Sequence, residues 1–334
     1  MPKKIVVTKT PLRVSFIGGG TDIANFYTKY SGLTVTSAIN KFVYVTVKEH
    51  GKLFNRSFRL SYSKTENKNK LDNVQNDIIR ETLKFIKVNK PLYISSISDI
   101  PANSGLGSSS AFTVGLVKAL YEFKNIKISN LKIAKIASKI EIEKVRSPIG
   151  KQDQYSTAVG GFNSIFFKKN SSVMVKKINK INFINKIFEN SVFIWLGKTR
   201  KTNNILTDQN KYFYSNKKKL IRIKELAKNF LNIVNQKIFL LEDIAKLIDN
   251  SWSLKKSLSK KINNKKIQKI YNESIRNGCL GGKVLGAGGG GFLLVMVKKN
   301  RIKNFIKNMT KYDNSLIISK FKFEPSGSEV IASL

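Results

Sequence analysis

The 334-residue sequence contains only one cysteine, Cys279, and one histidine, His50. A single cysteine excludes an intramolecular disulfide and a cysteine-based zinc cluster, and it is typical of a reducing compartment. One histidine makes a serine–histidine–aspartate hydrolase or a multi-histidine metal site hard to build. No run of about 18 apolar residues is present, and the start of the chain, MPKKIVVTKT, has no apolar segment of signal-peptide length. We therefore expect a cytoplasmic protein with no membrane association.

Acidic residues are also scarce, since 21 Asp and Glu stand against 61 Lys and Arg, for a formal net charge of +40. Such a charge is typical of proteins that bind nucleic acid, anionic membranes or acidic substrates. The lysines, however, are spread along the chain and mixed with Asn and Ile, as in KKINKIN and KKINNKKIQKI. We interpret the charge as biased residue usage on solvated faces and expect no specific nucleic-acid partner. A preference for polyanions is the alternative interpretation.

Hydrophobic residues make up 41% of the chain and aromatic residues 10%, which is enough to bury a sizeable core. Alternating and helical apolar spacing predicts an α+β chain. The predicted strands are 4–8, 12–18, 33–39, 41–49, 53–63, 91–98, 162–167, 191–197, two within 281–297, and 316–323; the predicted helices are 73–88, 108–121, 129–145, a short one after 148, several within 207–277, and 302–309. Because the pattern changes after a lysine-rich stretch near 168–190, we expect two domains, residues 1–185 and 186–334.

The most informative segment is DIPANSGLGSSSAF, in which a glycine loop leads into an apolar helix. Gly105 and Gly107 permit positive φ and close approach to an anion. Ser108 to Ser110 occupy the first helical turn, where backbone N–H groups have no helical partner and the macrodipole is positive. This combination predicts a phosphate site, and serine hydroxyls can also reach a magnesium ion. The simpler alternative is an N-cap made by Ser108 alone.

Two further glycine clusters are present. PLRVSFIGGGTD ends a strand and then opens a helix, where Asp22 is either a cap or a ligand contact. Arg13 lies among apolar strand residues, so we expect it to be partly buried and to have an anionic partner. GGKVLGAGGGGF formally contains G-x-G-x-x-G, but a strand follows it rather than a helix, which disfavours a dinucleotide site. A close approach of another group to this backbone is favoured over a simple hairpin.

Three acidic residues complete the set of candidates. Glu141 has apolar helical neighbours and is expected to face inward, where a glutamate needs a metal, a base or a proton. Glu143 has Lys139 and Arg146 at helical spacing, which is typical of a solvated face. Asp153 follows a Pro-Gly turn near a helix start, with Lys151 as a possible charge partner. Its alternative role is a first-turn carboxylate that interacts with the helix dipole.

In this order, PLRVSFIGGGTD, PANSGLGSSSAF, SPIGKQDQY and GGKVLGAGGGGF resemble the motifs of the GHMP kinases, the superfamily of galactokinase, homoserine kinase and mevalonate kinase. Within the superfamily, GGGTD, GKQDQY and LGKTRKTNNIL are most similar to the D-glycero-D-manno-heptose 7-phosphate kinases. The resemblance implies a ribosomal-protein-like amino-terminal domain and a ferredoxin-like, helix-rich carboxy-terminal domain, with the active site in the cleft between them. A monomer or a homodimer is expected.

The resemblance also implies a role for each matching residue. ATP would be bound by Gly105, Leu106, Gly107, Ser108, Ser109 and Ser110 with Gly288 and Gly289; Mg²⁺ by Ser109 and Glu141; and the sugar by Gly19, Gly20, Thr21, Asp22 and Lys151. Asp153 would be the catalytic aspartate, with Arg13 beside it. Asp153 would then orient the anomeric hydroxyl and accept its proton, while Arg13 would stabilise charge on the transferred phosphoryl group.

The phosphate of a phosphorylated sugar needs a basic anchor. Lys198, Thr199 and Arg200 follow the strand SVFIWLG and are the candidates, although they could also be ordinary lysine-rich surface. The expected function is an ATP- and Mg²⁺-dependent sugar 1-kinase that uses heptose 7-phosphate for surface-glycan precursors. The alternatives are a related kinase for an unphosphorylated sugar such as L-fucose and, more remotely, a non-catalytic polyanion-binding protein.

Overall fold

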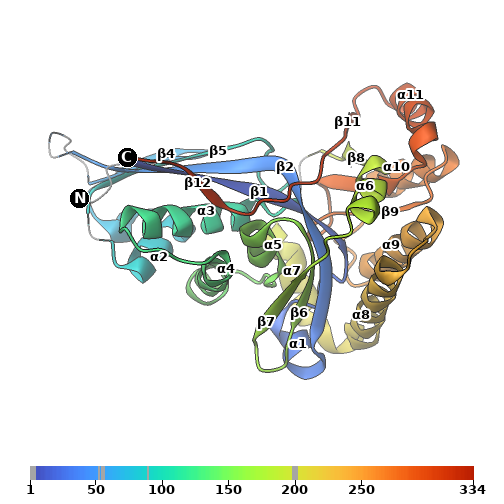
Figure 1. Cartoon of the computed structure of the whole chain (residues 1–334), viewed down its shortest axis with the longest axis horizontal. Helices are drawn as coiled ribbons and strands as arrows, with labels where there is room; N and C mark the ends of the chain where they lie inside the picture. Colours follow the sequence, from blue (N-terminus) through green and yellow to red (C-terminus); the bar gives the residue numbers. More distant parts are fainter. Residues whose placement is uncertain (1–4, 52, 54–56, 89, 198–201) are drawn as a thin grey trace.

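The computed structural model of the chain describes residues 5–51, 53, 57–88, 90–197 and 202–334. Its described strands form a larger and a smaller sheet (Figure 1). The larger sheet contains β1 (Ile5–Ile17), β2 (Gly32–Glu49), β3 (Phe58–Ser61), β4 (Thr65–Lys68), β5 (Leu92–Ser98), β6 (Phe162–Phe167), β7 (Val173–Lys177) and β12 (Glu329–Ser333). Its order is β12-β1-β2-β5-β3-β4, while β6 pairs with β2 and β7 with β6. The long β1–β2 pair is therefore the centre of this sheet.

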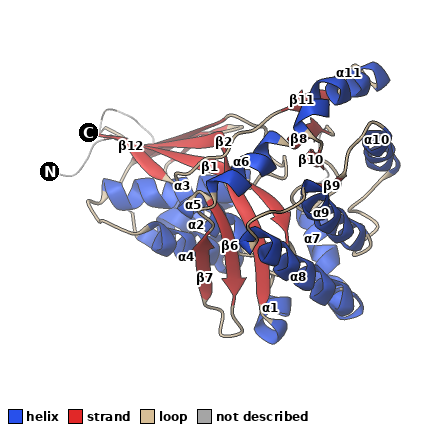
Figure 2. Cartoon of the chain, turned by 45° about the vertical axis from the view of Figure 1, so that its right-hand side comes forward, coloured by secondary structure: helices blue, strands red, loops and turns tan. Residues whose placement is uncertain are grey.

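Helices pack on one face of the larger sheet. They are α2 (Asp77–Ile86), α3 (Ser108–Phe123), α4 (Asn130–Lys139) and α5 (Gln152–Val159), with a 3-10 turn η1 (Leu71–Asn73) and a π turn η2 (Ile140–Lys144). The short helix α1 (Ala24–Tyr30) packs instead on α8 (Phe213–Asn235). α3 packs directly on β1 and β2, and α5 packs on α3 (Figure 2). The first turn of α3 and the first turn of α5 thus come close to β1.

The smaller sheet has the order β11-β8-β10-β9. The elements from residue 181 onward are α6 (Ile181–Glu189), β8 (Ser191–Trp195), α7 (Thr202–Lys211), α8 (Phe213–Asn235), α9 (Leu241–Lys256), α10 (Lys265–Arg276), β9 (Gly281–Val284), β10 (Phe292–Met296), η3 (Lys299–Arg301), α11 (Ile302–Tyr312) and β11 (Ile317–Ser319). α8 packs on α9, and α9 packs on β9. One hydrophobic core joins the two sheets, because it includes Phe16 of β1, Phe193 of β8 and Leu294 of β10.

Most of the elements predicted from the sequence are present, with two kinds of difference. The predicted strands 4–8 and 12–18 are one strand, β1, which passes through Pro11 at a register irregularity, where a ladder hydrogen bond is dispensable. The predicted strands 33–39 and 41–49 are likewise one strand, β2. The structure also contains β4, β7, α6 and β12, which the sequence did not predict. β7 and α6 lie in the lysine-rich stretch, whose polar composition conceals their apolar faces.

The last strand returns to the first sheet. β12 pairs antiparallel with β1, with Val6 opposite Ser333, so residues 329–333 belong to the larger sheet although the sequence-based division places them in the second domain. The division after residue 185 falls inside α6. The chain therefore crosses between the two halves twice, and the boundary remains a sequence-based prediction.

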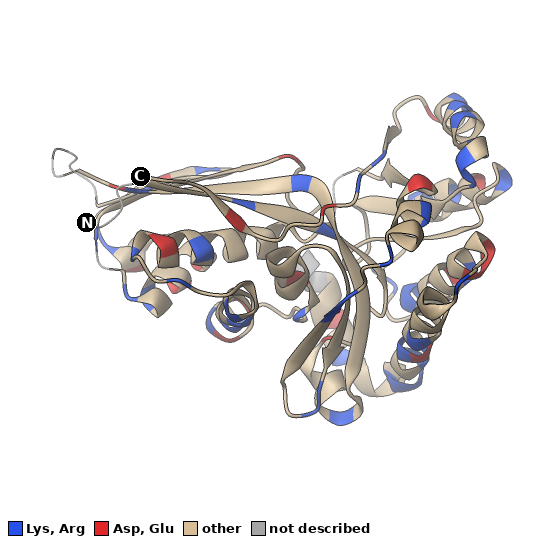
Figure 3. Ribbon diagram, in the orientation of Figure 1, with Lys and Arg blue, Asp and Glu red and all other residues tan. Residues whose placement is uncertain are grey.

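Positive charge is distributed over helices and strands in both halves of the molecule (Figure 3). This distribution agrees with the interpretation of the lysines as solvated surface. Within the described part of the chain, no helix combines the length and the apolar character needed to cross a membrane.

Phe16 of β1 lies among aromatic rings from β6, α6 and α8. It is fully buried and stacks on Phe162 with ring centroids 5.2 Å apart, and Phe188 and Phe230 lie at 6.2 and 6.5 Å. We expect Phe16→Ala to lower the free energy of unfolding by about 3–5 kcal/mol, because a large buried ring leaves a cavity. Urea denaturation measures this, with Ile97→Ala, at a side chain 72% exposed, as a control within about 0.5 kcal/mol of wild type. A loss below about 1 kcal/mol for Phe16→Ala would contradict the prediction.

Candidate active site

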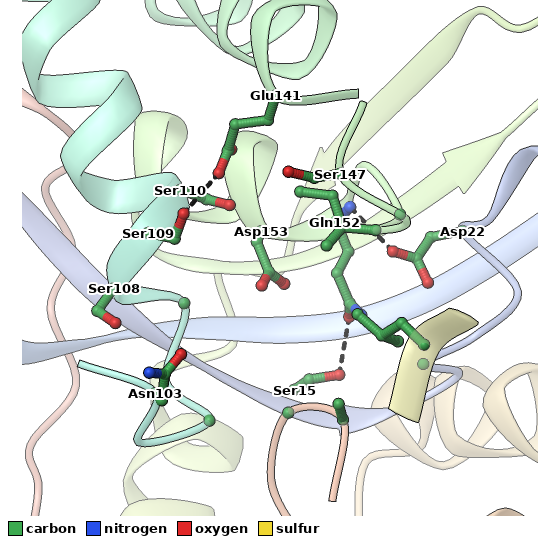
Figure 4. A pocket seen from close by; sticks show the side chains of 18 of the residues that line it. Ser15, Asp22, Asn103, Ser108, Ser109, Ser110, Glu141, Ser147, Gln152 and Asp153 are labelled. Atoms are coloured by element: carbon green, nitrogen blue, oxygen red, sulfur yellow. Dashed lines mark hydrogen bonds between the residues drawn. The ribbon is translucent and has the colours of Figure 1, made fainter. Parts of the chain in front are cut away.

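A pocket of about 480 Å³ lies where β1, the loop before α3, the first turn of α5 and the β9–β10 glycine loop meet (Figure 4). Most of the residues predicted from the sequence line it: Arg13, Gly19, Gly20, Asp22, Gly105, Gly107, Ser108, Ser109, Ser110, Glu141, Asp153 and Gly288. Leu206 and Gln209 of α7 also border it. Segments that are far apart in the sequence therefore contribute to one site.

The glycine–serine loop has the geometry expected of an anion site. Gly105 and Gly107 adopt positive φ values of 81° and 78°. The N-cap of α3 is Gly107, and it makes no side-chain capping bond, so the alternative of Ser108 as an ordinary N-cap is wrong. The first turn of a sixteen-residue helix, at its positive end, consequently faces the pocket.

The second glycine loop packs against the first, backbone to backbone. A Cβ atom on Gly105 would lie 2.6 Å from the carbonyl oxygen of Leu285, and Gly286 packs equally closely on Gly105. The amide of Phe292 donates to the carbonyl of Ser104 at 3.1 Å. This contact confirms that another group approaches the second loop closely, and that group is the phosphate-type loop itself.

Glu141 lies in the π turn after α4 and is 1% exposed, which confirms the predicted inward face. Its Oε1 accepts from Ser109 Oγ at 2.8 Å, and its Oε2 accepts from Gln154 Nε2 at 2.6 Å. Burial raises the pKa of Glu141, while these hydrogen bonds lower it. Both donors are neutral, so neither balances the charge of the Glu141 carboxylate, which lines the pocket. Glu143, by contrast, is exposed to solvent.

Arg13 and Asp153 form the central ion pair. Arg13 Nε donates to Asp153 Oδ1 at 2.7 Å, and Nη2 donates to Oδ2 at 2.6 Å. The third nitrogen, Nη1, donates to the carbonyl of Gly105 at 2.7 Å. Arg13 is 3% exposed and the Asp153 side chain 25%, so the arginine is buried behind a carboxylate that faces the pocket. The predicted anionic partner of Arg13 is thus Asp153.

Asp22 is held by backbone amides. Its Oδ1 accepts from the amide of Gly20 at 3.0 Å and its Oδ2 from the amide of Gln152 at 3.2 Å. Burial raises the pKa of Asp22, and the nearby charge of Asp153 raises it further. The helix expected to open at Asp22 begins at Ala24, and its N-cap is Ile23, so Asp22 is not the cap.

Some predicted contacts lie outside the pocket. Thr21 is fully buried and its hydroxyl donates to the carbonyls of Gly18 and Leu33, so it holds the turn together. Lys151 donates to the carbonyl of Ser171 and its ammonium lies 4.8 Å from the Tyr27 ring, away from Asp153. Leu106 and Gly289 are not among the lining residues. Lys198, Thr199 and Arg200 lie outside the described residues.

Two buried lysines near the pocket were not predicted. Lys255 of α9 lines it, is 8% exposed and donates to the carbonyl of Gly286. Lys283 of β9 is 2% exposed and donates to the carbonyls of Ser15 and Phe16 at 2.9 and 3.2 Å. The helical spacing of the apolar residues Ile248 and Trp252 with Lys255 places that lysine on the buried face of α9. This spacing is the signal that could have identified it.

The chain matches two family models, GHMP kinases N terminal domain over residues 73–161 and GHMP kinases C terminal over residues 235–314. A D-glycero-alpha-D-manno-heptose 7-phosphate kinase from Campylobacter jejuni subsp. jejuni serotype O:2 is 31% identical, over 97% of this chain and 98% of its own. A mevalonate kinase from Methanocaldococcus jannaschii is 26% identical, over 70% of this chain and 72% of its own.

Solved structures are similar over the whole chain. The crystal structure of a D-glycero-D-manno-heptose 1-phosphate kinase from Bacteroides thetaiotaomicron has a TM-score of 0.77 at 22% identity, covering 98% of this chain and 99% of that one. A putative sugar kinase from Campylobacter jejuni has a TM-score of 0.74 at 27% identity and covers 100% of both chains. The chain therefore belongs to the GHMP kinases. It is a phosphotransferase with the two-domain α+β fold of that family, as its motifs predict.

The burial of Glu141 leads us to predict how Glu141→Gln changes the stability of the fold. In Glu141→Gln, the new amide can accept from Ser109, and a flip of Gln154 would turn its unpartnered Oε1 toward the new NH₂ group. Because burial raises the pKa of Glu141, its protonated form stabilises the fold below about pH 4.5, and that stabilisation is lost as pH rises through the folded-state pKa. We expect Glu141→Gln to be at least as stable as wild type at pH 8.

Thermal unfolding between pH 5 and pH 9 measures the effect. The stability of Glu141→Gln relative to wild type should increase with pH, whereas Glu143→Gln, at an exposed position, should show no such trend. A Glu141→Gln variant that is less stable by more than about 1 kcal/mol at pH 8 would show that the carboxylate makes a strongly stabilising interaction instead.

Proposed function

We propose that the protein is an ATP- and Mg²⁺-dependent sugar kinase that phosphorylates the anomeric hydroxyl of D-glycero-D-manno-heptose 7-phosphate. The observation that carries this proposal is the meeting of the Arg13–Asp153 pair and the first turn of α3 in one pocket. Phosphoryl transfer needs positioning and neutralisation of charge more than covalent chemistry. This pocket offers both.

The first turn of α3 suits the nucleotide phosphates, because Gly107 at the N-cap has no side chain to occupy the free N–H groups. Ser109 and Glu141 offer two oxygen ligands, joined by a 2.8 Å hydrogen bond, and oxygen is the ligand atom that Mg²⁺ prefers. The buried carboxylate without a charged donor favours a cation at this place. When bound, the ion would neutralise charge on the phosphates.

Asp153 is the group that acts on the acceptor. Arg13 binds the carboxylate of Asp153 from one side, and the carboxylate faces the pocket on the other. In this position Asp153 orients the sugar hydroxyl and accepts the hydroxyl proton as the sugar oxygen attacks phosphorus. Asp22, held by two amides beside the same pocket, accepts a hydrogen bond from another sugar hydroxyl. Gly150 makes room for this carboxylate, because a Cβ atom there would overlap Asp22.

The choice of sugar rests on the relative from Campylobacter jejuni, whose similarity covers both chains almost completely. A phosphorylated sugar needs a cationic anchor, for which Lys198, Thr199 and Arg200 are the sequence candidates. Later in the chain, α7 borders the pocket through Leu206 and Gln209. A kinase for an unphosphorylated sugar such as L-fucose is the alternative.

The first test removes the proposed base. Asp153→Asn keeps the shape of the side chain but should lower kcat by about 10²–10⁴-fold, because a general base typically contributes that much. ADP release is measured with Mg-ATP and a panel of heptose 7-phosphate, mannose 6-phosphate, L-fucose, galactose and mevalonate. Asp243→Asn, at an exposed position on α9, is the control and should keep wild-type turnover. Equal turnover by Asp153→Asn would refute the assignment of Asp153.

The second test concerns the substrate phosphate. Arg200→Ala should raise KM for heptose 7-phosphate by about tenfold or more, because it removes a charge-assisted hydrogen bond. KM for any neutral sugar that is turned over should stay within about twofold. Arg222→Ala on α8, outside the pocket lining, controls for the loss of one positive charge. Turnover of a neutral sugar alone would refute the heptose phosphate assignment while leaving the kinase intact.

A further inference from the structure

Among the residues that the structure describes, three cationic side chains are buried around the pocket: Arg13, Lys255 and Lys283. Arg13 uses Nε, Nη1 and Nη2 for Asp153 and Gly105, and Lys283 donates to two backbone carbonyls. Lys255 differs from both. Within the part of the chain that the structure describes, its ammonium has one hydrogen-bond acceptor, the carbonyl of Gly286. An ammonium has three N–H groups, so two of them remain for a ligand.

The position of Lys255 points to the kind of ligand. α9 brings it to the pocket beside the β9–β10 glycine loop, which packs on the loop before α3. The charged groups that face it are Arg13, Asp22, Asp153 and Lys283. Its ammonium is therefore near the carboxylate that we assign as the base and also near the phosphate-type loop. The space between these two groups is where a phosphoryl group would pass from nucleotide to sugar.

We propose that Lys255 is a further catalytic residue, whose ammonium donates to an oxygen of the phosphoryl group that is transferred. This inference rests on the proposed phosphoryl transfer, but it does not depend on which sugar accepts the group. In that step the bond between the γ-phosphorus and the bridging oxygen of ADP breaks, the bond from the sugar oxygen forms, and the hydroxyl proton goes to Asp153. Lys255 neither gains nor loses a proton. It neutralises charge on the oxygens that are transferred.

The cost of burial explains why this lysine favours an anion. Burial lowers the pKa of Lys255, Arg13 lowers it further, and Asp22 and Asp153 oppose the change, so that the resulting pKa is about 8. A buried ammonium with one carbonyl acceptor is only partly compensated for the water it has lost. A phosphoryl oxygen would restore this compensation, and it would favour the charged form of the amine.

A structural alternative is that Lys255 merely fastens the glycine loop through Gly286. The two roles are distinguished by nucleotide binding without any sugar, using calorimetry with Mg²⁺ and either ADP or a non-hydrolysable ATP analogue. If Lys255 contacts the terminal phosphoryl group, Lys255→Met should weaken the analogue about tenfold or more relative to ADP, the range expected for one charge-assisted hydrogen bond. Lys255→Arg should retain most of the preference.

The control is Lys246→Met, an exposed lysine on the same helix, which should bind both nucleotides like wild type. Equal weakening of both nucleotides by Lys255→Met would show a loop fastener and overturn the proposal, as would no weakening. In a separate titration with heptose 7-phosphate, weaker binding by Lys255→Met, with both nucleotides bound as in wild type, would assign Lys255 to the sugar's phosphate. That result would also overturn the proposal. A wild-type protein that binds neither nucleotide would refute the nucleotide part of the proposed function first.

A second measurement uses only wild type and Lys255→Arg, so it does not depend on whether Lys255→Met folds. In wild type, the preference for the analogue over ADP should decrease as pH rises from 8 to 9.5, because the ammonium loses its proton there. The decrease should be absent in Lys255→Arg, which keeps Arg13, Asp22, Asp153 and Lys283 unchanged. A decrease of the same size in Lys255→Arg would assign the titration to another of these groups and overturn the proposal.

Discussion

The ion pair between Arg13 and Asp153 is the interaction on which the rest of the pocket depends. The guanidinium binds both carboxylate oxygens and, through its third nitrogen, the carbonyl of Gly105, while the backbone amide of Arg13 donates to Leu106. A lysine could not make these three planar contacts at once. Gly107 completes the arrangement, because a Cβ atom there would lie 3.1 Å from the Arg13 side chain. One residue of β1 thereby fixes the glycine–serine loop and the carboxylate of Asp153 relative to each other.

Charge balance explains why such a pocket needs a further cation when a nucleotide binds. Its buried or half-buried carboxylates are Asp22, Glu141 and Asp153, and burial raises the pKa of the first two. The cations Arg13, Lys255 and Lys283 equal them in number. A triphosphate adds further negative charge to surroundings where unpaired charge is costly. The helix dipole of α3 offsets part of this charge, and the oxygens of Ser109 and Glu141 offer a place for the magnesium ion we propose.

The sequence was informative where function depends on local chemistry. The glycines and serines before α3, the inward face of Glu141 and the need of Arg13 for an anionic partner could all be predicted, because each follows from neighbours within one or two turns. The pairing of β12 with β1 could not, since contacts about 320 residues apart leave no local pattern. Side-chain direction was equally hard to predict in the turns. Thr21 and Lys151 stand in the predicted motifs, yet hydrogen bonds to the carbonyls of Leu33 and Ser171 direct them away from the pocket.

Lys255 shows why the overall charge conceals function in this protein. Among 61 Lys and Arg residues, composition gives no reason to select one, and a lysine-rich helix is the usual form of a solvated face. Burial selects it, because a lysine that is 8% exposed has lost most of its water and must regain hydrogen bonds from the protein or from a ligand. The same reasoning separates Lys283, whose two carbonyl acceptors make it a structural contact, from Lys255, whose remaining donors make it a candidate for chemistry. In a chain so rich in positive charge, the cations that we propose for catalysis are distinguished by their burial.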